Sequence, residues 1–117
     1  MPARDPGWDL LLDYDGETFV LAHGYWVKFE VRRARRSRAR PHGIAYSLTL
    51  HAPDGTRLVG FDNAHPPPAA RGRRRRPYDH RHRLGSVRTY AYRDAQMLHE
   101  DFWREVRSVL RERGIEP

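Results

Sequence analysis

Alternating apolar and polar positions predict strands through the first half of the chain. A period of two is typical of a strand that buries one face and exposes the other. Two segments show the alternation clearly, residues 25–31 and residues 44–50. Their apolar positions are Tyr25, Val27, Phe29 and Val31 in the first segment, and Ile44, Tyr46, Leu48 and Leu50 in the second.

Turn signals between apolar stretches predict antiparallel pairing. Pro53-Asp54-Gly55 follows the second alternating segment, so residues 58–61 should return beside it as the second arm of a hairpin. Asp15-Gly16 likewise predicts a turn between a short strand at 10–14 and its partner at 18–21. Residues 87–92 are predicted to form the last strand.

The apolar spacing then changes to that of a helix. Asp94 should cap a helix that runs to about Arg113 and ends at Gly114. Its apolar stripe consists of Leu98, Phe102, Val106, Val109 and Leu110. The 117 residues suit one domain. We therefore expect a single α+β domain, an antiparallel sheet of about five strands with one C-terminal helix packed across one face.

Residues 64–83 show no periodicity and include three consecutive prolines, Pro66, Pro67 and Pro68. An irregular connection of this length is unusual inside a small domain, and is commonly functional or disordered. We predict a mobile loop rich in proline and arginine. Its central arginines are Arg73, Arg74, Arg75 and Arg76.

The net charge of +7 and the pI near 10.5 favour an anionic partner. Lys28 is the one lysine among the 22 basic residues, and arginine binds phosphate through a planar fork that lysine lacks. A GC-rich genome is an alternative cause of this bias. A run that includes Arg36 precedes the predicted hairpin, and a second run follows it. Both should therefore emerge at one edge of the sheet and contact nucleic-acid phosphates there.

Several classes of protein are excluded or disfavoured by composition. The absence of cysteine excludes disulfides, cysteine–zinc sites and thiol nucleophiles. No apolar run approaches the roughly 20 residues of a membrane span, and no signal peptide is recognisable. We expect a soluble cytoplasmic protein without a membrane partner.

His80 and His82 are the strongest candidates for catalysis. In an extended segment both imidazoles would project from one side of the chain, with Asp79, Arg81 and Arg83 on the other. One imidazole could remove the 2′-hydroxyl proton of RNA while the other protonates the 5′-oxygen leaving group, and a guanidinium could stabilise the phosphorane. The alternative is a solvated basic loop in which the histidines only add polarity.

Other polar residues come near this pair if the predicted hairpin forms. His42 opens one arm and Asp62-Asn63 ends the other, so antiparallel pairing should bring them together. Asp62 could then act as a base or orient a histidine, and Asn63 could donate to a phosphate, or both could cap a turn. Substrate contacts are further predicted for His65 and Tyr78.

Zinc or manganese bound by His80, His82, His65 and Asp62 is the rival chemistry. The neighbouring arginines disfavour a bound dication, because their fixed charge repels it. We predict no metal and no cofactor.

Four segments together resemble the TumE-type toxins of toxin–antitoxin systems. The segments are residues 42–48 (HGIAYSL), 60–65 (GFDNAH), 78–82 (YDHRH) and 98–103 (LHEDFW). The resemblance implies a small toxin encoded beside an antitoxin with a DNA-binding domain, acting by RNA cleavage or by interference with translation. The motif residues that it carries over are His42, Asp62, Asn63, His65, Asp79, His80 and His82.

The sequence therefore predicts a metal-independent endoribonuclease toxin. His80 and His82 would act as acid and base, and Asp79 or Asp62 would orient one of them. Arg81, Arg83 and the arginine runs would hold the RNA phosphates. Two alternatives stay open: a basic nucleic-acid-binding protein or translation-blocking toxin that does not cleave RNA, and an interaction protein whose basic surface meets an acidic antitoxin.

Overall fold

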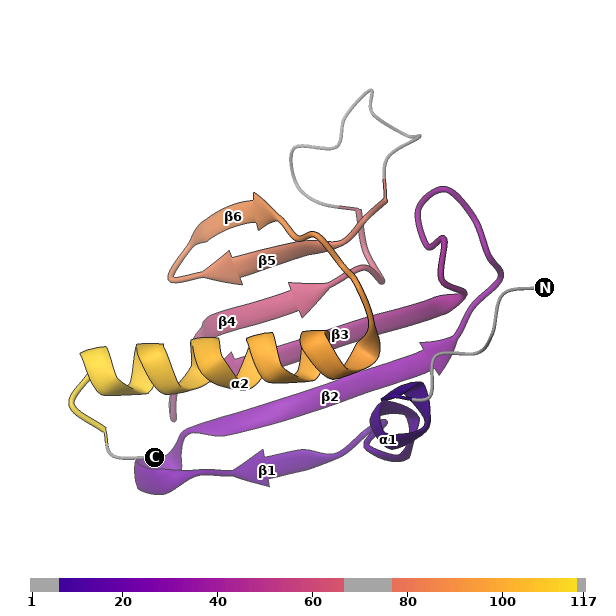
Figure 1. Ribbon diagram of the computed structural model, residues 1–117. Coiled ribbons are helices and arrows are strands. Elements are labelled where there is room, and N and C mark those ends of the chain that lie inside the picture. Colours follow the sequence, from indigo (N-terminus) through magenta and orange to yellow (C-terminus); the bar gives the residue numbers. More distant parts are fainter. Residues whose placement is uncertain (1–6, 67–76, 116–117) are drawn as a thin grey trace.

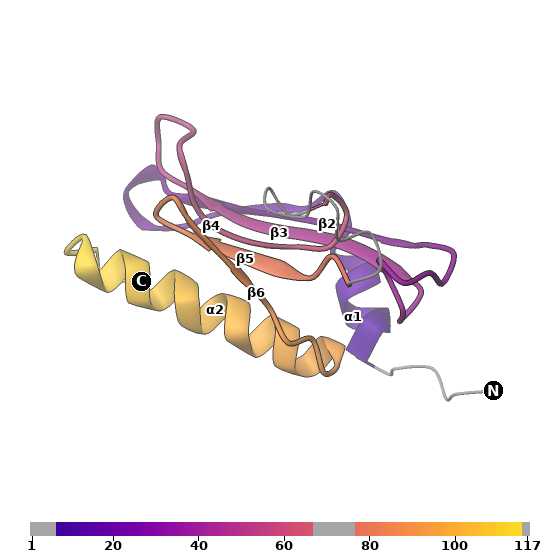
Figure 2. The same cartoon turned by 90° about the horizontal axis from the view of Figure 1, so that it is seen from above.

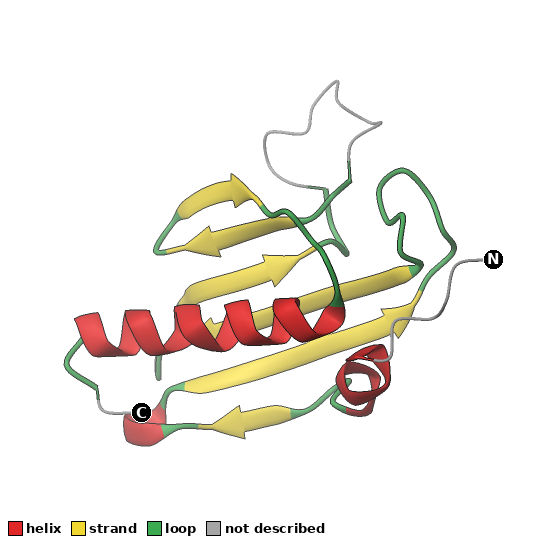
Figure 3. Ribbon diagram, in the orientation of Figure 1, coloured by secondary structure: helices red, strands yellow, loops and turns green. Residues whose placement is uncertain are grey.

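The computed structural model describes residues 7–66 and 77–115, which form an antiparallel sheet with a long helix across one face (Figures 1 and 3). Within those residues the sheet has six strands, in the order of the chain. The strands are β1 (Thr18–Val20), β2 (Trp26–Arg33), β3 (Ile44–His51), β4 (Arg57–Asp62), β5 (His80–Arg83) and β6 (Ser86–Thr89). The helices are α1 (Gly7–Asp13), a 3-10 turn η1 (Ala22–Gly24) and α2 (Ala95–Glu112). The predicted α+β class is confirmed.

The strand register places the predicted apolar positions on one face, under α2 (Figure 2). Phe29 lies opposite Leu48, and Leu48 lies opposite Phe61. All three side chains are fully buried, and the rings of Phe29 and Phe61 meet Phe102 of α2 edge-on. The period-two pattern therefore identified the core face of the sheet correctly.

The ends of α2 follow the predicted signals. Asp94 is the N-cap, and its Oδ1 accepts a hydrogen bond from the backbone N–H of Met97 over 2.8 Å. Gly114 follows the helix with a φ of +76°, a conformation that glycine adopts without a Cβ clash. No helix of residues 7–66 and 77–115 is long and apolar enough to cross a membrane.

Two predicted elements were wrong in type or extent. Residues 10–14, expected as a strand, belong mostly to helix α1, because Trp8 and Leu11 lie three positions apart and both reach the core. The last strand ends at Thr89 rather than at position 92.

Strand β5 was missed within the predicted irregular loop, because its sequence, HRHR, has no apolar face. The predicted mobility and phosphate contacts of Arg73–Arg76 lie outside the described residues.

Candidate functional site: an imidazole pair opposite the helix

His80 and His82 lie on the face of the sheet that α2 does not cover. Phe61, which packs under α2, is opposite Arg81, so the two histidines on either side of Arg81 project to the other face. His82 is opposite Gly60, and His80 is opposite Asp62. The two imidazole centroids are 4.8 Å apart with their planes at 75°. The spacing of the two histidines therefore predicted their common orientation correctly.

The two imidazoles have complementary hydrogen-bond partners. Nδ1 of His80 lies 2.6 Å from the carbonyl oxygen of Tyr78, which can only accept, so this nitrogen carries a proton. Nδ1 of His82 lies 3.1 Å from Nη2 of Arg57, which can only donate, so this nitrogen offers its lone pair. In His80 the bond to Tyr78 therefore fixes a proton on Nδ1, and Nε2 is the second ring nitrogen. Neutral His82 has the opposite arrangement, with its proton on Nε2 and a lone pair on Nδ1.

The environment of His82 favours its neutral form. Burial lowers the pKa of His82 below its usual 6.5, and the charges of Arg57 and His80 lower it further, against a smaller opposing effect of Asp62. At pH 7 His82 is therefore an uncharged imidazole. Sequence reasoning missed Arg57, which directly precedes the predicted returning arm at 58–61 and is the first residue of β4. Its position beside His82 depends on a register shift between Leu50 and His51.

Asp62 ends β4 and shapes the turn that follows. Its Oδ1 accepts hydrogen bonds from the backbone N–H groups of Ala64 and His65, over 2.6 and 3.1 Å. Its Oδ2 lies 3.1 Å from Nδ1 of His65. Asp62 thus has the turn-capping role that the sequence offered as one option, and its other oxygen contacts the imidazole of His65.

Asn63 bridges β3 and the end of β4. Its Oδ1 accepts from the backbone N–H of Tyr46 over 2.8 Å, and its Nδ2 donates to the carbonyl of Ile44 over 2.9 Å. The side chain is buried, so Asn63 holds the end of the hairpin together instead of projecting with the histidines.

Asp79 and His42 lie on the other side of the sheet. The hydroxyl of Tyr46, a core residue, donates to Oδ2 of Asp79 over 2.6 Å. The His42 ring lies 4.3 Å from the ring of Tyr92, and its charge acts on Asp79. Burial raises the pKa of Asp79, while the bond from Tyr46 opposes that rise. Asp79 therefore lies on the α2 side of the sheet, where its carboxyl accepts from Tyr46, while the charge of His80 also acts on it.

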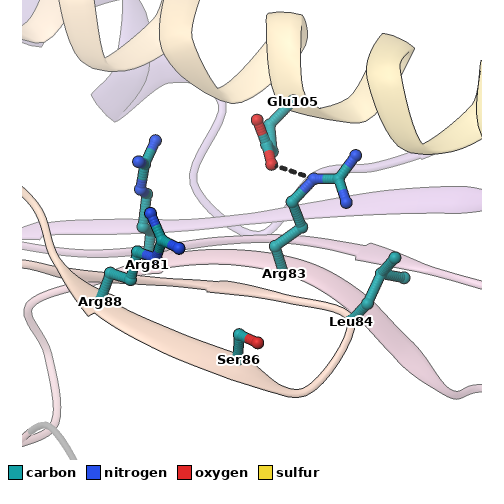
Figure 4. Close-up of a pocket in the computed structure, with 6 residues that line it drawn as sticks. All are labelled: Arg81, Arg83, Leu84, Ser86, Arg88 and Glu105. Atoms are coloured by element: carbon teal, nitrogen blue, oxygen red, sulfur yellow. Dashed lines mark ion pairs between the residues drawn. The ribbon is translucent and has the colours of Figure 1, made fainter.

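The predicted substrate-binding groups are also divided between the two faces. Arg81 and Arg83 project toward α2, away from the imidazoles (Figure 4). Tyr78 precedes β5, and its ring lies 5.4 Å from the guanidinium of Arg40. Arg36 is exposed in the loop before β3. Arg40 also donates to the carbonyls of Asn63 and Ala64, over 2.9 and 2.6 Å, so the first arginine run reaches the exit of the hairpin.

The imidazole pair is closely surrounded. His80 and His82 expose 2% and 8% of their surfaces, and Asp62 exposes 7%. Within the described ranges, no group of three or more histidine, aspartate or glutamate side chains is arranged to hold a metal ion.

Comparison with known proteins gives one match. The family model described as Toxin TumE matches residues 19–110, which include every strand except the first residue of β1, and nearly all of α2. No curated protein and no solved structure matches the chain significantly.

Proposed function

Since the chain belongs to the TumE toxin family and is a toxin of a toxin–antitoxin system, we propose that it acts on RNA as a metal-independent endoribonuclease. The observation that carries this proposal is the pair of imidazoles 4.8 Å apart with complementary hydrogen-bond partners. Two histidines in different protonation states are what cleavage through the 2′-hydroxyl requires.

In this mechanism His82 is the base and His80 is the acid. The lowered pKa of His82 keeps it unprotonated at neutral pH. The bound phosphate draws the Arg57 guanidinium away from Nδ1 of His82, and this nitrogen then takes the 2′-hydroxyl proton. The 2′-oxygen attacks phosphorus, the bond from phosphorus to the 5′-oxygen breaks, and Nε2 of protonated His80 gives that oxygen a proton. Arg57 stabilises the phosphorane charge. The products are a 2′,3′-cyclic phosphate and a 5′-hydroxyl.

A second function is favoured by the burial of the same groups. His80 and His82 expose 2% and 8% of their surfaces, so an RNA strand must displace neighbouring groups to reach them. If the imidazoles instead serve to pack β5 against β4, the toxin binds RNA or the translation machinery without cutting it. This alternative predicts salt-dependent binding, no cleavage products and tolerance of substitution at His80.

A cleavage assay distinguishes the two functions. Purified toxin is incubated with a defined single-stranded RNA in EDTA, and the new ends are mapped. The proposal predicts 2′,3′-cyclic phosphate ends with metal absent, and a loss of cleavage of about 100-fold or more in His80→Ala and in His82→Ala. Cleavage that requires a divalent ion, or that persists in both variants, would contradict it.

The matched control for these variants is His23→Asn. His23 is exposed and has a φ of +59°, which asparagine tolerates, so this change removes an imidazole without disturbing the fold. Cleavage by His23→Asn should equal that of the parent. Circular dichroism of all variants establishes that lost cleavage is not lost structure.

A further inference from the structure

Arg81 and Arg88 form a like-charged pair on the side of the sheet that faces α2. They lie directly opposite each other in the register of β5 and β6, and Figure 4 shows both side chains extending toward the helix. Like charges at such opposed positions destabilise a sheet. Neither guanidinium has an ion-pair or hydrogen-bond partner among residues 7–66 and 77–115. Two positive charges are therefore held together without compensation.

The neighbouring Arg83, in contrast, has its positive charge neutralised by carboxylates of α2. It projects to the same side, where it forms an ion pair with Glu105 of α2 (Figure 4). It also forms an ion pair with Glu112 of α2 and donates to the Ser108 hydroxyl over 3.1 Å. The helix thus neutralises Arg83 and leaves Arg81 and Arg88 available to another anion.

Space for that anion exists between the hairpin and the helix. A cavity of about 430 Å³ is lined by Arg81, Arg83, Leu84, Ser86, Arg88 and Glu105. Because Arg83 already holds Glu105, the unpaired charge of the cavity is positive. The cavity therefore suits carboxylate or phosphate groups.

Strand β6 beside the cavity is an open edge. In the part of the chain that the structure describes, β6 pairs with β5 alone, and all four of its residues are exposed. Leu84 and Val87 expose 47% and 39% of their surfaces there. An unpaired edge with exposed apolar side chains is a template for an added strand.

We propose that this surface binds the cognate antitoxin through an extended acidic segment, which adds to β6 as a further strand. Its backbone pairs with the outer edge of β6. Side chains beside Ser86 and Arg88 are acidic and reach Arg81 and Arg88, whereas the alternate side chains, beside Val87 and Thr89, are apolar or β-branched.

A peptide is favoured over RNA for two reasons. The free N–H and C=O groups of an edge strand pair with another peptide backbone, which RNA cannot supply. The cavity also lies on the face opposite His80 and His82, so an RNA strand at the imidazoles does not pass through it. The proposal rests on the toxin's family and on this surface, and is independent of RNA cleavage.

Amide hydrogen exchange of the full-length toxin, free and in complex with its antitoxin, tests the strand addition. Exchange at Ser86–Thr89 should slow in the complex, while exchange at Thr18–Val20 on the opposite edge should not change. Unchanged exchange at Ser86–Thr89 would overturn the proposal.

Affinity measurements test the charge pair. The double variant Arg81→Gln/Arg88→Gln should bind the antitoxin roughly tenfold more weakly, and the loss should shrink in high salt. The control Arg107→Gln/Arg111→Gln makes the same change of charge at exposed positions of α2 and should bind as the parent does. The substitutions remove the repulsion between the two guanidinium groups, so the melting temperature of the free variant should equal or exceed that of the parent. This measurement shows that weaker binding is not caused by a loss of structure.

A single-stranded RNA oligonucleotide serves as the second probe. Its affinity for the Arg81→Gln/Arg88→Gln variant should stay within about twofold of the parent's, apart from the loss that the control variant also shows. If RNA affinity falls while antitoxin affinity does not, the surface binds RNA and the proposal is wrong.

Discussion

The Tyr46 hydroxyl donates to Oδ2 of Asp79 over 2.6 Å, in a buried position. Burial raises the pKa of Asp79, and the hydrogen bond from Tyr46 is the largest effect that opposes the rise. The Tyr46 hydroxyl therefore stabilises the ionised form of this buried carboxyl, together with a backbone hydrogen bond and the charges of His42 and His80.

Tyr46→Phe should destabilise the fold by about 1–3 kcal/mol at pH 7, because it leaves a buried carboxylate without its donor. A raised pKa favours the protonated carboxyl in the folded state, so this group's contribution to stability is present at acidic pH and is lost as the pH rises through the folded pKa. The cost of Tyr46→Phe should thus be smaller near pH 4 than at pH 7. Urea unfolding at both pH values measures it.

Tyr25→Phe is the control for that measurement. The Tyr25 hydroxyl is also buried, but it accepts a bond from Nε of Arg113, whose charge does not change over this range. Its cost should be the same at both pH values. An equal pH dependence of the two variants would contradict the assigned role of Asp79.

Arg57→Gln should raise the pKa of His82. Burial is the main cause of the lowered value and the Arg57 guanidinium is the next, so the variant should move the titration back toward 6.5 without reaching it. NMR titration of the imidazole C–H signals measures the shift. A His82 signal that titrates above 6.5 in the parent would refute the assignment.

The stability of the toxin should fall as the pH drops below 6.5. Because the pKa of His82 is lowered in the folded state, the unfolded state binds the proton at a higher pH than the folded state does. The stabilisation from neutral His82 is therefore complete above pH 6.5 and is lost as the pH falls toward the folded pKa. His99, whose pKa burial also lowers, acts in the same direction. His82→Gln should make the decline between pH 7 and pH 5 shallower, as measured by chemical denaturation. An unchanged slope would mean that His82 does not titrate as described.

Gly60→Val should destabilise the fold by about 1–3 kcal/mol, whereas Gly60→Ala should be neutral or slightly stabilising. A Cβ at this position would lie 3.5 Å from Cδ2 of His82 and 3.5 Å from Cδ of Arg57, ordinary contacts that further methyl groups would crowd. Thermal unfolding of both variants provides the comparison. Equal stability of the valine and alanine variants would show that the space beside His82 is not restricted.

Asp94→Ala should cost about 1 kcal/mol, because the N–H of Met97 loses its acceptor at the start of α2. Asp94→Ser keeps an acceptor and should cost only a few tenths of that. Urea unfolding separates the two, and equal losses would assign the effect to something other than capping.

Local patterns in the sequence predicted the parts of the fold where one face is apolar. The alternation in residues 25–31 and 44–50 identified the core face, and Asp94 and Gly114 marked the ends of α2. Strand β5 has no apolar face to reveal it. The side away from α2 carries the two histidines, and the side toward α2 carries two arginines, of which Arg83 forms ion pairs with the helix. Helix α1 was missed because the segment is short and only Trp8 and Leu11 are buried.

The candidate site was predictable only in part. The spacing of His80 and His82 gave their shared face once the segment was assumed to be extended. Arg57 reaches His82 through a register shift in a different strand pair, and the pairing of Arg81 with Arg88 follows from a strand that the sequence did not show. Such relationships depend on how distant strands align, and local periodicity carries no information about that alignment.

The four residues of β5 serve both sides of the sheet at once. Deleting a single residue from it would move guanidinium groups to the imidazole face and imidazoles to the face toward α2. Both surfaces would be disrupted by the same change. Evolutionary change at either surface is therefore restricted to substitutions that keep the strand's length, and insertions are restricted to the turns at its ends.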